Sequence, residues 1–338
     1  MKRIGMLTSG GDCQSLNATM RGVVKGLIYG NYKRLTSKDF SGILTRGGTI
    51  LGTSRQPFKL MRVPDENGVD KVEAMKSTYR YLDLDCLVVL GGNGSQKSAN
   101  MLSEEGLNVV SLPKTIDNDL WGTDMTFGFQ SAVDIATNAI DCIHTTAASH
   151  DRVFIVELMG HKVGWVTLHA GIAGGADVIL IPEIPYNLNH VIEAIRRRSE
   201  QGKGFTILAV AEGAISKEDA KLSKKKYKEK LANRQYSTVG YELAAQIEAA
   251  TGQEVRVTIP GHTQRGGSPV PFDRVISSRL GAAAAELIHE EKYGRMVVMK
   301  GYEVSSIPLK DTAGKLKYVS ADDQIIKQAK ILGISFGD

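Results

Sequence analysis

Residues 84–95, LDCLVVLGGNGS, are the stretch that decides the fold class. The apolar run 84–90 is short and is followed by glycine, which predicts a strand buried on both faces. Residues 91–95 form a glycine-rich turn that leads into a segment of helical period. Such a turn presents backbone amides to an anion such as phosphate, and the start of the next helix adds partial positive charge. Taken alone, the segment also fits an ordinary strand-to-helix turn.

The same rhythm recurs along the chain. Apolar runs alternate with segments of helical spacing, which predicts parallel sheets covered by helices on both faces. With at least seven strands in 338 residues, we expect an α/β protein with two domains formed from one interwoven chain. A second glycine-rich turn, 8–12 (TSGGD), follows the first predicted strand, and two such turns favour a phosphorylated ligand. The predicted strands are 4–7, 84–90, 109–112, 153–158, 178–181, 205–211 and 255–259, and the predicted helices include 16–28, 133–143 and 275–291.

Composition excludes several classes of protein. The 42 basic and 37 acidic residues give a net charge of +5, and much of the excess lies in 217–230, which we interpret as a solvated helix face. Aromatic residues make up 6% of the chain and are not interleaved with basic ones, so no nucleic-acid partner is expected. No apolar run approaches the ~20 residues of a membrane helix and no signal core is present, so we expect a cytoplasmic protein without membrane contact. The three cysteines have neither metal-site nor disulfide spacing.

Residues 112–119 (LPKTIDND) place two carboxylates and a hydroxyl group directly after a predicted strand. Ligands of parallel sheets bind beyond the carboxyl ends of the strands, so reactive groups are expected here. Asp117 could accept the proton of an attacking hydroxyl group. An Asx-rich turn that caps backbone amides is the other interpretation of these residues. The two glycine-rich turns upstream favour the first.

Residues 260–268 (PGHTQRGGS) follow the predicted strand that contains Arg256. Arg256, His262 and Arg265 would suit a dianionic sugar phosphate, because a guanidinium group matches phosphate oxygens. Arg152, at the start of another predicted strand, is a weaker candidate of the same kind. Alternatively, the arginines pair with surface carboxylates and His262 is a core histidine whose hydrogen bonds are satisfied.

Taken together, these motifs resemble those of the phosphofructokinase family. The match covers nearly the whole chain in order, and 261–273 (GHTQRGGSPVPFD) is its most specific segment. The other matching segments are 8–12 with Asn17 and Arg21, 46–49 with 51–52 and Arg55, 91–95, 113–119 with 122–124, 149–152, 159–160 and 172–175.

The resemblance implies a 6-phosphofructokinase, a glycolytic enzyme that transfers a phosphoryl group to the 1-hydroxyl of fructose 6-phosphate. It implies two interwoven Rossmann-like domains with mainly parallel sheets. The larger, nucleotide-binding domain would be 1–128 with 264–303, and the smaller, sugar-phosphate-binding domain 129–263 with 304–338. It also implies a homo-oligomer, a dimer or a tetramer, in which Arg152 and Arg256 reach the site of a neighbouring subunit.

The resemblance also assigns roles to individual residues. Asp117 would be the general base, with Thr115 and Asp119 beside it, and Arg55 would neutralise the migrating phosphoryl group. The residues implied for the sugar phosphate are Arg152, Met159, Gly160, Glu212, Arg256, His262 and Arg265. The residues implied for ATP and its Mg²⁺ are Gly11, Arg55, Gly92, Asn93, Gly94, Ser95 and Lys114, with Asn93 as the metal ligand.

Two positions bear on the phosphoryl donor. In the family, ATP users tend to have glycine at position 94, because a side chain there would fill phosphate space. Pyrophosphate users tend to have aspartate there and lysine at position 114. This chain has Gly94 and Lys114, a combination that resembles the mixed-substrate group, whose members with this glycine generally use ATP. ATP is therefore the expected donor, and Lys114 either offsets donor charge or is a solvated side chain.

The chain departs from the family pattern at several side chains. Asn93 stands where an aspartate is thought to hold Mg²⁺, and it offers an oxygen without the charge. His161 replaces an arginine, which removes a permanent charge near the transferred group. Gln14 and Ser15 replace a proline and a glycine of the first loop.

Two further departures concern the sheet and regulation. Residues 31–41 are fewer than relatives have there, so one strand of the sheet is expected to be missing. Lys25 and His144 stand where well-known bacterial enzymes have effector-binding arginines, so we do not transfer that regulation to this chain.

Two other functions remain open. A pyrophosphate-dependent relative is supported by Lys114 and opposed by Gly94. A catalytically weak paralogue that binds sugar phosphate as a regulator is supported by Asn93, His161 and the short segment. The presence of Asp117, Asp119 and Arg55 counts against that paralogue.

Overall fold

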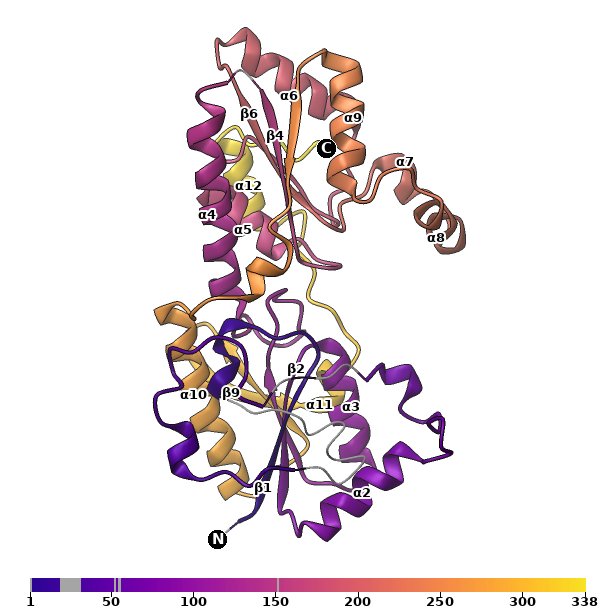
Figure 1. Ribbon diagram of the computed structural model, residues 1–338, viewed down its shortest axis with the longest axis vertical. Coiled ribbons are helices and arrows are strands. Elements are labelled where there is room, and N and C mark those ends of the chain that lie inside the picture. The colour runs from indigo at the N-terminus through magenta and orange to yellow at the C-terminus, as the bar shows by residue number, and fades with distance from the viewer. Residues whose placement is uncertain (1, 19–31, 52, 54–55, 151) are drawn as a thin grey trace. The chain divides into compact units, whose positions relative to one another are not determined.

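The computed structural model describes residues 2–18, 32–51, 53, 56–150 and 152–338. The chain divides into two compact units, each built around one β-sheet (Figure 1). The first unit is Met1–Ala132 with Arg265–Lys317, and the second is Val133–Gln264 with Tyr318–Asp338. Because each unit is assembled from two separate parts of the chain, the expected α/β fold with two interwoven domains is confirmed.

Within the described residues, the sheet of the first unit has five strands: β1 (Ile4–Ser9), β2 (Cys86–Gly91), β3 (Val109–Pro113), β8 (Arg295–Lys300) and β9 (Glu303–Pro308). Their order is β1-β2-β3-β8-β9; the first four are parallel, and β9 is antiparallel to β8. Every residue of β2 is buried, as expected for an apolar run inside a parallel sheet. Ser9 pairs with Gly91, and Gly91 with Pro113, so β1, β2 and β3 end level with one another.

Helices cover both faces of this sheet. The helices described in the first unit are η1 (Gln14–Ala18), η2 (Ser37–Phe40), η3 (Phe58–Leu60), α2 (Lys71–Tyr81), α3 (Asn93–Glu104), α10 (Pro271–His289) and α11 (Leu309–Thr312). α3 packs on β2 and β3, whereas α10 packs on β3 and β8 from the other side (Figure 1). α2 begins after Asp70, whose side chain accepts hydrogen bonds from the amides of Val72 and Glu73.

The second unit has a smaller, entirely parallel sheet in its described residues. Its strands are β4 (Val153–Leu158), β5 (Val178–Leu180), β6 (Thr206–Ala211) and β7 (Val255–Thr258), in the order β5-β6-β4-β7. All residues of β4 and β6 are buried. Its helices are α5 (Trp165–Ala173), α6 (Leu188–Glu200), α7 (Lys217–Ala220), α8 (Lys224–Ala232), α9 (Val239–Thr251), η4 (Gly261–Arg265) and α12 (Gln324–Ile331). α4 (Phe129–Ala147) begins in the first unit and continues into the second.

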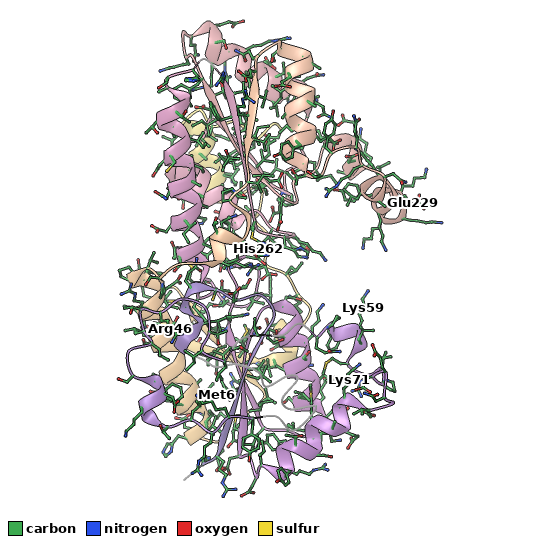
Figure 2. The ribbon with its side chains drawn as sticks, viewed as in Figure 1. Met6, Arg46, Lys59, Lys71, Glu229 and His262 are labelled. Carbon is green, nitrogen blue, oxygen red and sulfur yellow. The ribbon has the colours of Figure 1, made fainter. Side chains whose placement is uncertain are left out.

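The lysine-rich stretch forms an arm of the second unit. α7 and α8 extend beyond α9 (Figure 1), and neither contains a buried residue. Figure 2 shows Glu229 of α8 pointing away from the rest of its unit. The prediction of a solvated helix face for 217–230 is therefore confirmed.

One predicted domain boundary is wrong. β8 and β9 are absent from the predicted strands, and we expected the first domain to end at residue 303. It continues to Lys317 instead, because β9 pairs with β8 along its whole length. The expected divisions after 128 and 263 lie within four residues of the observed ones.

The described part of the short segment contains no strand, in agreement with the expectation that one strand of the sheet is missing. Residues 32–41 contain η2 and no strand, and β1 is an edge strand of the described sheet. The predicted helix 16–28 lies, beyond residue 18, outside the described residues. None of the helices in the described part of the chain combines the length and apolar character needed to cross a lipid bilayer. All three cysteines are free, as expected.

Candidate active site

Three loops meet at the carboxyl edge of the first unit's sheet. They follow β1, β2 and β3, whose last residues pair with one another in register. The loops are 10–12, 92–95 and 114–119, and they contain both predicted phosphate turns and the predicted base. In parallel sheets this edge is where ligands bind.

Two cationic side chains, the buried Lys114 and the partly exposed Arg265, hold the first loop. Lys114 is 1% exposed, and its Nζ donates hydrogen bonds to the carbonyl oxygens of Ser9, at 2.8 Å, and Gly11. The interpretation of Lys114 as a solvated side chain is therefore wrong. On the same loop, Nη1 of Arg265 donates to the carbonyl of Asp12 at 2.9 Å. A Cβ atom at Gly11 would lie 2.7 Å from that nitrogen, so only glycine fits there without displacing Arg265.

The second loop is compact at one end and open at the other. A Cβ atom at Gly91 would lie 2.1 Å from Cβ of Ser95, which excludes any side chain at position 91. At Gly94 the Cβ direction meets nothing within 4 Å. Asn93 is the first residue of α3, and its Nδ2 donates to the carbonyl of Lys315 at 2.6 Å. The helix thus begins at the loop, with open space beside Gly94.

The polar residues of the third loop differ in their hydrogen-bond partners and in their exposure. The amide of Asp117 donates to Oγ1 of Thr115 at 3.1 Å. Asn118 has a left-handed backbone, φ 53°, and its Oδ1 accepts from the amide of Thr126 at 3.0 Å. Asn118 therefore binds an amide eight residues further along the chain, which is not the two-residue pattern of an Asx turn. Thr115 and Asp119 are buried, whereas Asp117 is partly exposed and keeps access to a ligand.

In the second unit, Glu212 organises the carboxyl edge. It follows β6, and its Oε1 accepts hydrogen bonds from the amides of Gly160, at 3.3 Å, and His161, at 2.8 Å, just after β4. The buried Gln264 accepts from the amide of Met159 at 3.3 Å and ties η4 to the same turn. Four predicted sugar-phosphate residues are thus grouped at this edge: Met159, Gly160, Glu212 and His262.

Arg152 and Arg256 lie at the opposite edge of that sheet. Arg152 precedes β4, and Arg256 is the second residue of β7, where it pairs with Phe154. Both guanidinium groups form ion pairs with Glu254. Seven residues separate Arg152 from Met159, which is about 20 Å of strand at ~3.3 Å per residue. The two groups of predicted residues in this unit therefore cannot contact the same small ligand.

Comparison with known proteins identifies the family. Residues 24–288 match the family model described as Phosphofructokinase. The chain belongs to the phosphofructokinase family. It is 52% identical, over 100% of its own length and 98% of the relative, to the ATP-dependent 6-phosphofructokinase of Spirochaeta thermophila. It is 47% identical to the ATP-dependent 6-phosphofructokinase 3 of Bacteroides thetaiotaomicron, over 99% of this chain and 100% of the relative.

A solved phosphofructokinase shares the fold. The structure of Pichia pastoris phosphofructokinase in the T-state matches with a TM-score of 0.76 and 32% identity, over 92% of this chain and 37% of the other. This chain thus spans about a third of that yeast chain. The family membership confirms the expected class of enzyme, a phosphotransferase that acts on a sugar hydroxyl.

The structure changes the interpretation of two predicted residues, His262 and Arg265. His262 is exposed on the turn after β7 (Figure 2), so it is not a core histidine. Arg265 belongs to the first unit, whereas the other residues predicted for the sugar phosphate belong to the second. Arg55 lies outside the described residues, as do Arg21, Lys25 and Asp151. The roles of all the predicted site residues stay predictions.

Sequence reasoning missed residues that hold these phosphofructokinase loops in place. The buried Gln96 donates to the carbonyls of Gly91, at 2.9 Å, and Leu112, at 3.3 Å, and so joins the second loop to β3. Its position one turn into a helix after a glycine-rich loop is the only signal for it. Lys317 carries no sequence signal, because Thr123 and Asp124, which accept its hydrogen bonds, lie far away along the chain.

Proposed function

We propose that the protein is an ATP-dependent 6-phosphofructokinase, which transfers the γ-phosphoryl group of ATP to the 1-hydroxyl of fructose 6-phosphate. The observation that carries the proposal is the position of Asp117. It lies partly exposed in the loop after β3, level with the two glycine-rich loops after β1 and β2. Relatives at 52% and 47% identity bear the name of this activity.

Asp117 acts as the general base. Its carboxylate accepts the proton of the 1-hydroxyl while that oxygen forms a bond to the γ-phosphorus, and the bond from phosphorus to the bridging oxygen of ADP breaks. The chain otherwise positions the reactants and stabilises charge, because phosphoryl transfer needs little covalent assistance. The amino end of α3 at Asn93 contributes partial positive charge to the phosphates.

Mg²⁺ is proposed to enter with ATP. The residues that the structure describes include no group of three or more His, Cys, Asp or Glu side chains suited to a metal. Such a group is unnecessary, because Mg²⁺ is commonly held by one or two side chains together with substrate phosphates. Asn93 uses its amide nitrogen on Lys315, which leaves its side-chain oxygen as the atom for the metal. When bound, the ion supplies charge neutralisation between the phosphates.

The donor is proposed to be ATP. Gly94 leaves open space at the amino end of α3, where an aspartate would place a negative charge next to the donor phosphates. The ammonium of Lys114, the residue that favoured pyrophosphate, is engaged with backbone carbonyls of the first loop. Both observations support the larger donor.

The sugar phosphate is proposed to lie between two copies of the chain. In this proposal the second unit binds the sugar through Met159, Gly160 and Glu212, and the first unit binds the nucleotide. Arg152 lies about 20 Å from that turn along β4, and Arg256 lies near the same amino edge of the sheet, so both are proposed to serve the 6-phosphate site of a neighbouring subunit. The proposal therefore includes a homo-oligomer, a dimer or a tetramer, and a cytoplasmic location.

The test is an assay of phosphoryl transfer with purified protein, fructose 6-phosphate and Mg²⁺, with either ATP or pyrophosphate as donor. We expect fructose 1,6-bisphosphate with ATP and much less with pyrophosphate. The reverse preference would replace the donor. No product with either donor would support the catalytically weak paralogue.

A variant tests the base in the same assay. Asp117→Ser is expected to lower kcat by about a thousandfold and to change the affinity for fructose 6-phosphate little, because general-base catalysis acts on the transition state. Asp311→Ser, on the exposed side of α11, is the matched control and should keep the wild-type rate. A loss of less than tenfold in Asp117→Ser would remove Asp117 from the role of base.

A further inference from the structure

Lys317 forms hydrogen bonds at two places along the loop that carries the proposed base. We call residues 114–124 the catalytic turn. The Nζ atom of Lys317 donates hydrogen bonds to the carbonyl oxygens of Thr123, at 2.9 Å, and Asp124, at 2.8 Å. Its backbone amide donates to the carbonyl of Asp119 at 2.8 Å. One residue of the C-terminal part of the chain therefore connects two parts of the catalytic turn.

The neighbouring residues strengthen this connection. Leu316 forms an antiparallel bridge with Leu120, so the backbone of the C-terminal segment runs alongside the turn. Oδ2 of Asp124 accepts from the amide of Gly301 at 2.6 Å, just after β8. The turn is thus fixed to the sheet at one side and to Lys317 at the other.

The charge of Lys317 is balanced by groups of both signs. The carboxylates of Asp119 and Asp124 favour its protonated form, and the ammonium of Lys300 at the end of β8 disfavours it. Burial outweighs these effects and lowers the pKa of Lys317 to about 8. The side chain therefore changes its charge slightly above neutral pH.

We propose that Lys317 is a positioning residue of the catalytic turn, whose protonated ammonium holds the turn in the geometry that brings Asp117 to the sugar hydroxyl. The inference rests on the proposed function, since only that function makes Asp117 a base. Loss of the proton leaves a neutral amine, whose hydrogen bonds to carbonyl oxygens are about half as strong. It also removes one cation from the neighbourhood of Asp119 and Asp124, while Asp124 keeps its ion pair with Lys300.

The experiment compares three forms of the full-length enzyme across about pH 6.5 to about pH 9.5. Wild-type kcat is expected to fall as the pH rises through about 8. Lys317→Met, a neutral side chain of similar length, should have a kcat about tenfold lower at pH 7 and no fall near pH 8. Lys317→Arg stays charged, so it should keep more activity and also lose the alkaline fall. Lys310→Met, an exposed lysine of α11, is the control and should follow the wild-type profile.

A second measurement does not depend on activity. Hydrogen exchange of the amides in 114–126 should be faster in Lys317→Met than in wild type at pH 7, and the difference should shrink above about pH 8.5, after correction for intrinsic rates. If wild type transfers no phosphoryl group but this difference is present, the proposed function fails and the positioning role stands. If wild type is active and both Lys317 variants keep the alkaline fall, the inference is wrong. Should Lys317→Met not fold, the profile of Lys317→Arg decides alone.

Discussion

At the scale of single residues, the burial and the hydrogen bonds of Lys114 indicate that it supports the first loop. Its ammonium donates to the carbonyls of Ser9 and Gly11, which joins the end of β3 to the loop after β1. A buried ammonium without such partners would be costly, so these carbonyls account for its position. The lysine that resembles a pyrophosphate-site residue is therefore, by its contacts, a support for the first phosphate loop. We therefore expect donor choice to depend on Gly94, beside which the space is open.

The substitution Gly94→Asp tests whether donor choice depends on position 94. The backbone at Gly94 has no left-handed φ and its Cβ direction is open, so the substitution should leave the fold intact. The new carboxylate would repel donor phosphates, and we expect kcat/KM for ATP to fall by about a hundredfold or more, which is ~2.7 kcal/mol. Gly94→Ala adds volume without charge and should lose less than tenfold. Equal losses in the two variants, measured with saturating fructose 6-phosphate, would show that space rather than charge controls the donor.

At the scale of elements, Asp273 joins the starts of two helices. This fully buried carboxylate, in the first turn of α10, accepts hydrogen bonds from the amide and the hydroxyl of Ser131, at 2.8 and 2.6 Å. Ser131 is in the first turn of α4, where a negative charge is favourable. Burial raises the pKa of Asp273, and the Ser131 hydrogen bonds oppose that rise. Asp273 is the last residue of 261–273, the segment most specific to the family, and it holds α4, the helix that runs from the first unit into the second.

Removal of the Asp273 carboxylate should lower the stability of the fold. Asp273→Ala leaves the buried donors of Ser131 without a partner, so we expect the free energy of unfolding to fall by about 2–3 kcal/mol. Asp141→Ala, on the exposed face of α4, should change it by no more than about 0.5 kcal/mol. Urea denaturation followed by circular dichroism measures both. Similar midpoints for the two variants would mean that Asp273 contributes little to α4.

At the scale of the whole molecule, the second unit presents two sets of ligand-binding candidates at opposite edges of one sheet. Glu212 lies at the carboxyl edge, and Arg152 and Arg256 at the amino edge, where both pair with Glu254. The strand between the edges is rigid, so no rotation of side chains brings them together. If both sets bind one substrate, as proposed above, an intact site needs a second copy of the chain.

Mixing two inactive variants tests the shared site. Glu212→Gln damages the edge that binds the sugar, and Arg152→Ser damages the edge that serves a neighbour. A hybrid dimer of the two contains one site with neither change, so unfolding and refolding an equal mixture should restore about one quarter of the wild-type activity. Glu212→Gln refolded alone is the control. No recovery, in a mixture shown to contain hybrids, would place both residues in the same subunit's site.

Features that depend on residues close together in the sequence could be predicted. Features that depend on contacts between residues far apart in the sequence could not. The strands β2 to β6 follow from short apolar runs, because strands buried on both faces need apolar side chains at nearly every position. The predicted strands β1 and β7 are only partly buried. β9 is absent from the predicted strands because its sequence, EVSSIP, has no apolar run of strand length, and the strand is defined by its partner β8. β8 is also absent from them, although it contains the buried apolar run 296–299. Asp117 and the glycine-rich loops lie at the same edge of the sheet, because each follows a parallel strand and the carboxyl ends of parallel strands share one edge.

The sequence by itself determined the alternation of strands and helices, the glycine-rich turns that follow the first two strands, and the family. These features depend on neighbouring residues, whose spacing sets burial and whose glycines set the turns. Only the tertiary structure decided that Lys114 is buried, that Lys317 holds the catalytic turn, and that Arg152 and Glu212 lie at opposite edges. Each of these depends on contacts between residues distant in the chain, and the packing of the sheets, not local periodicity, brings those residues together.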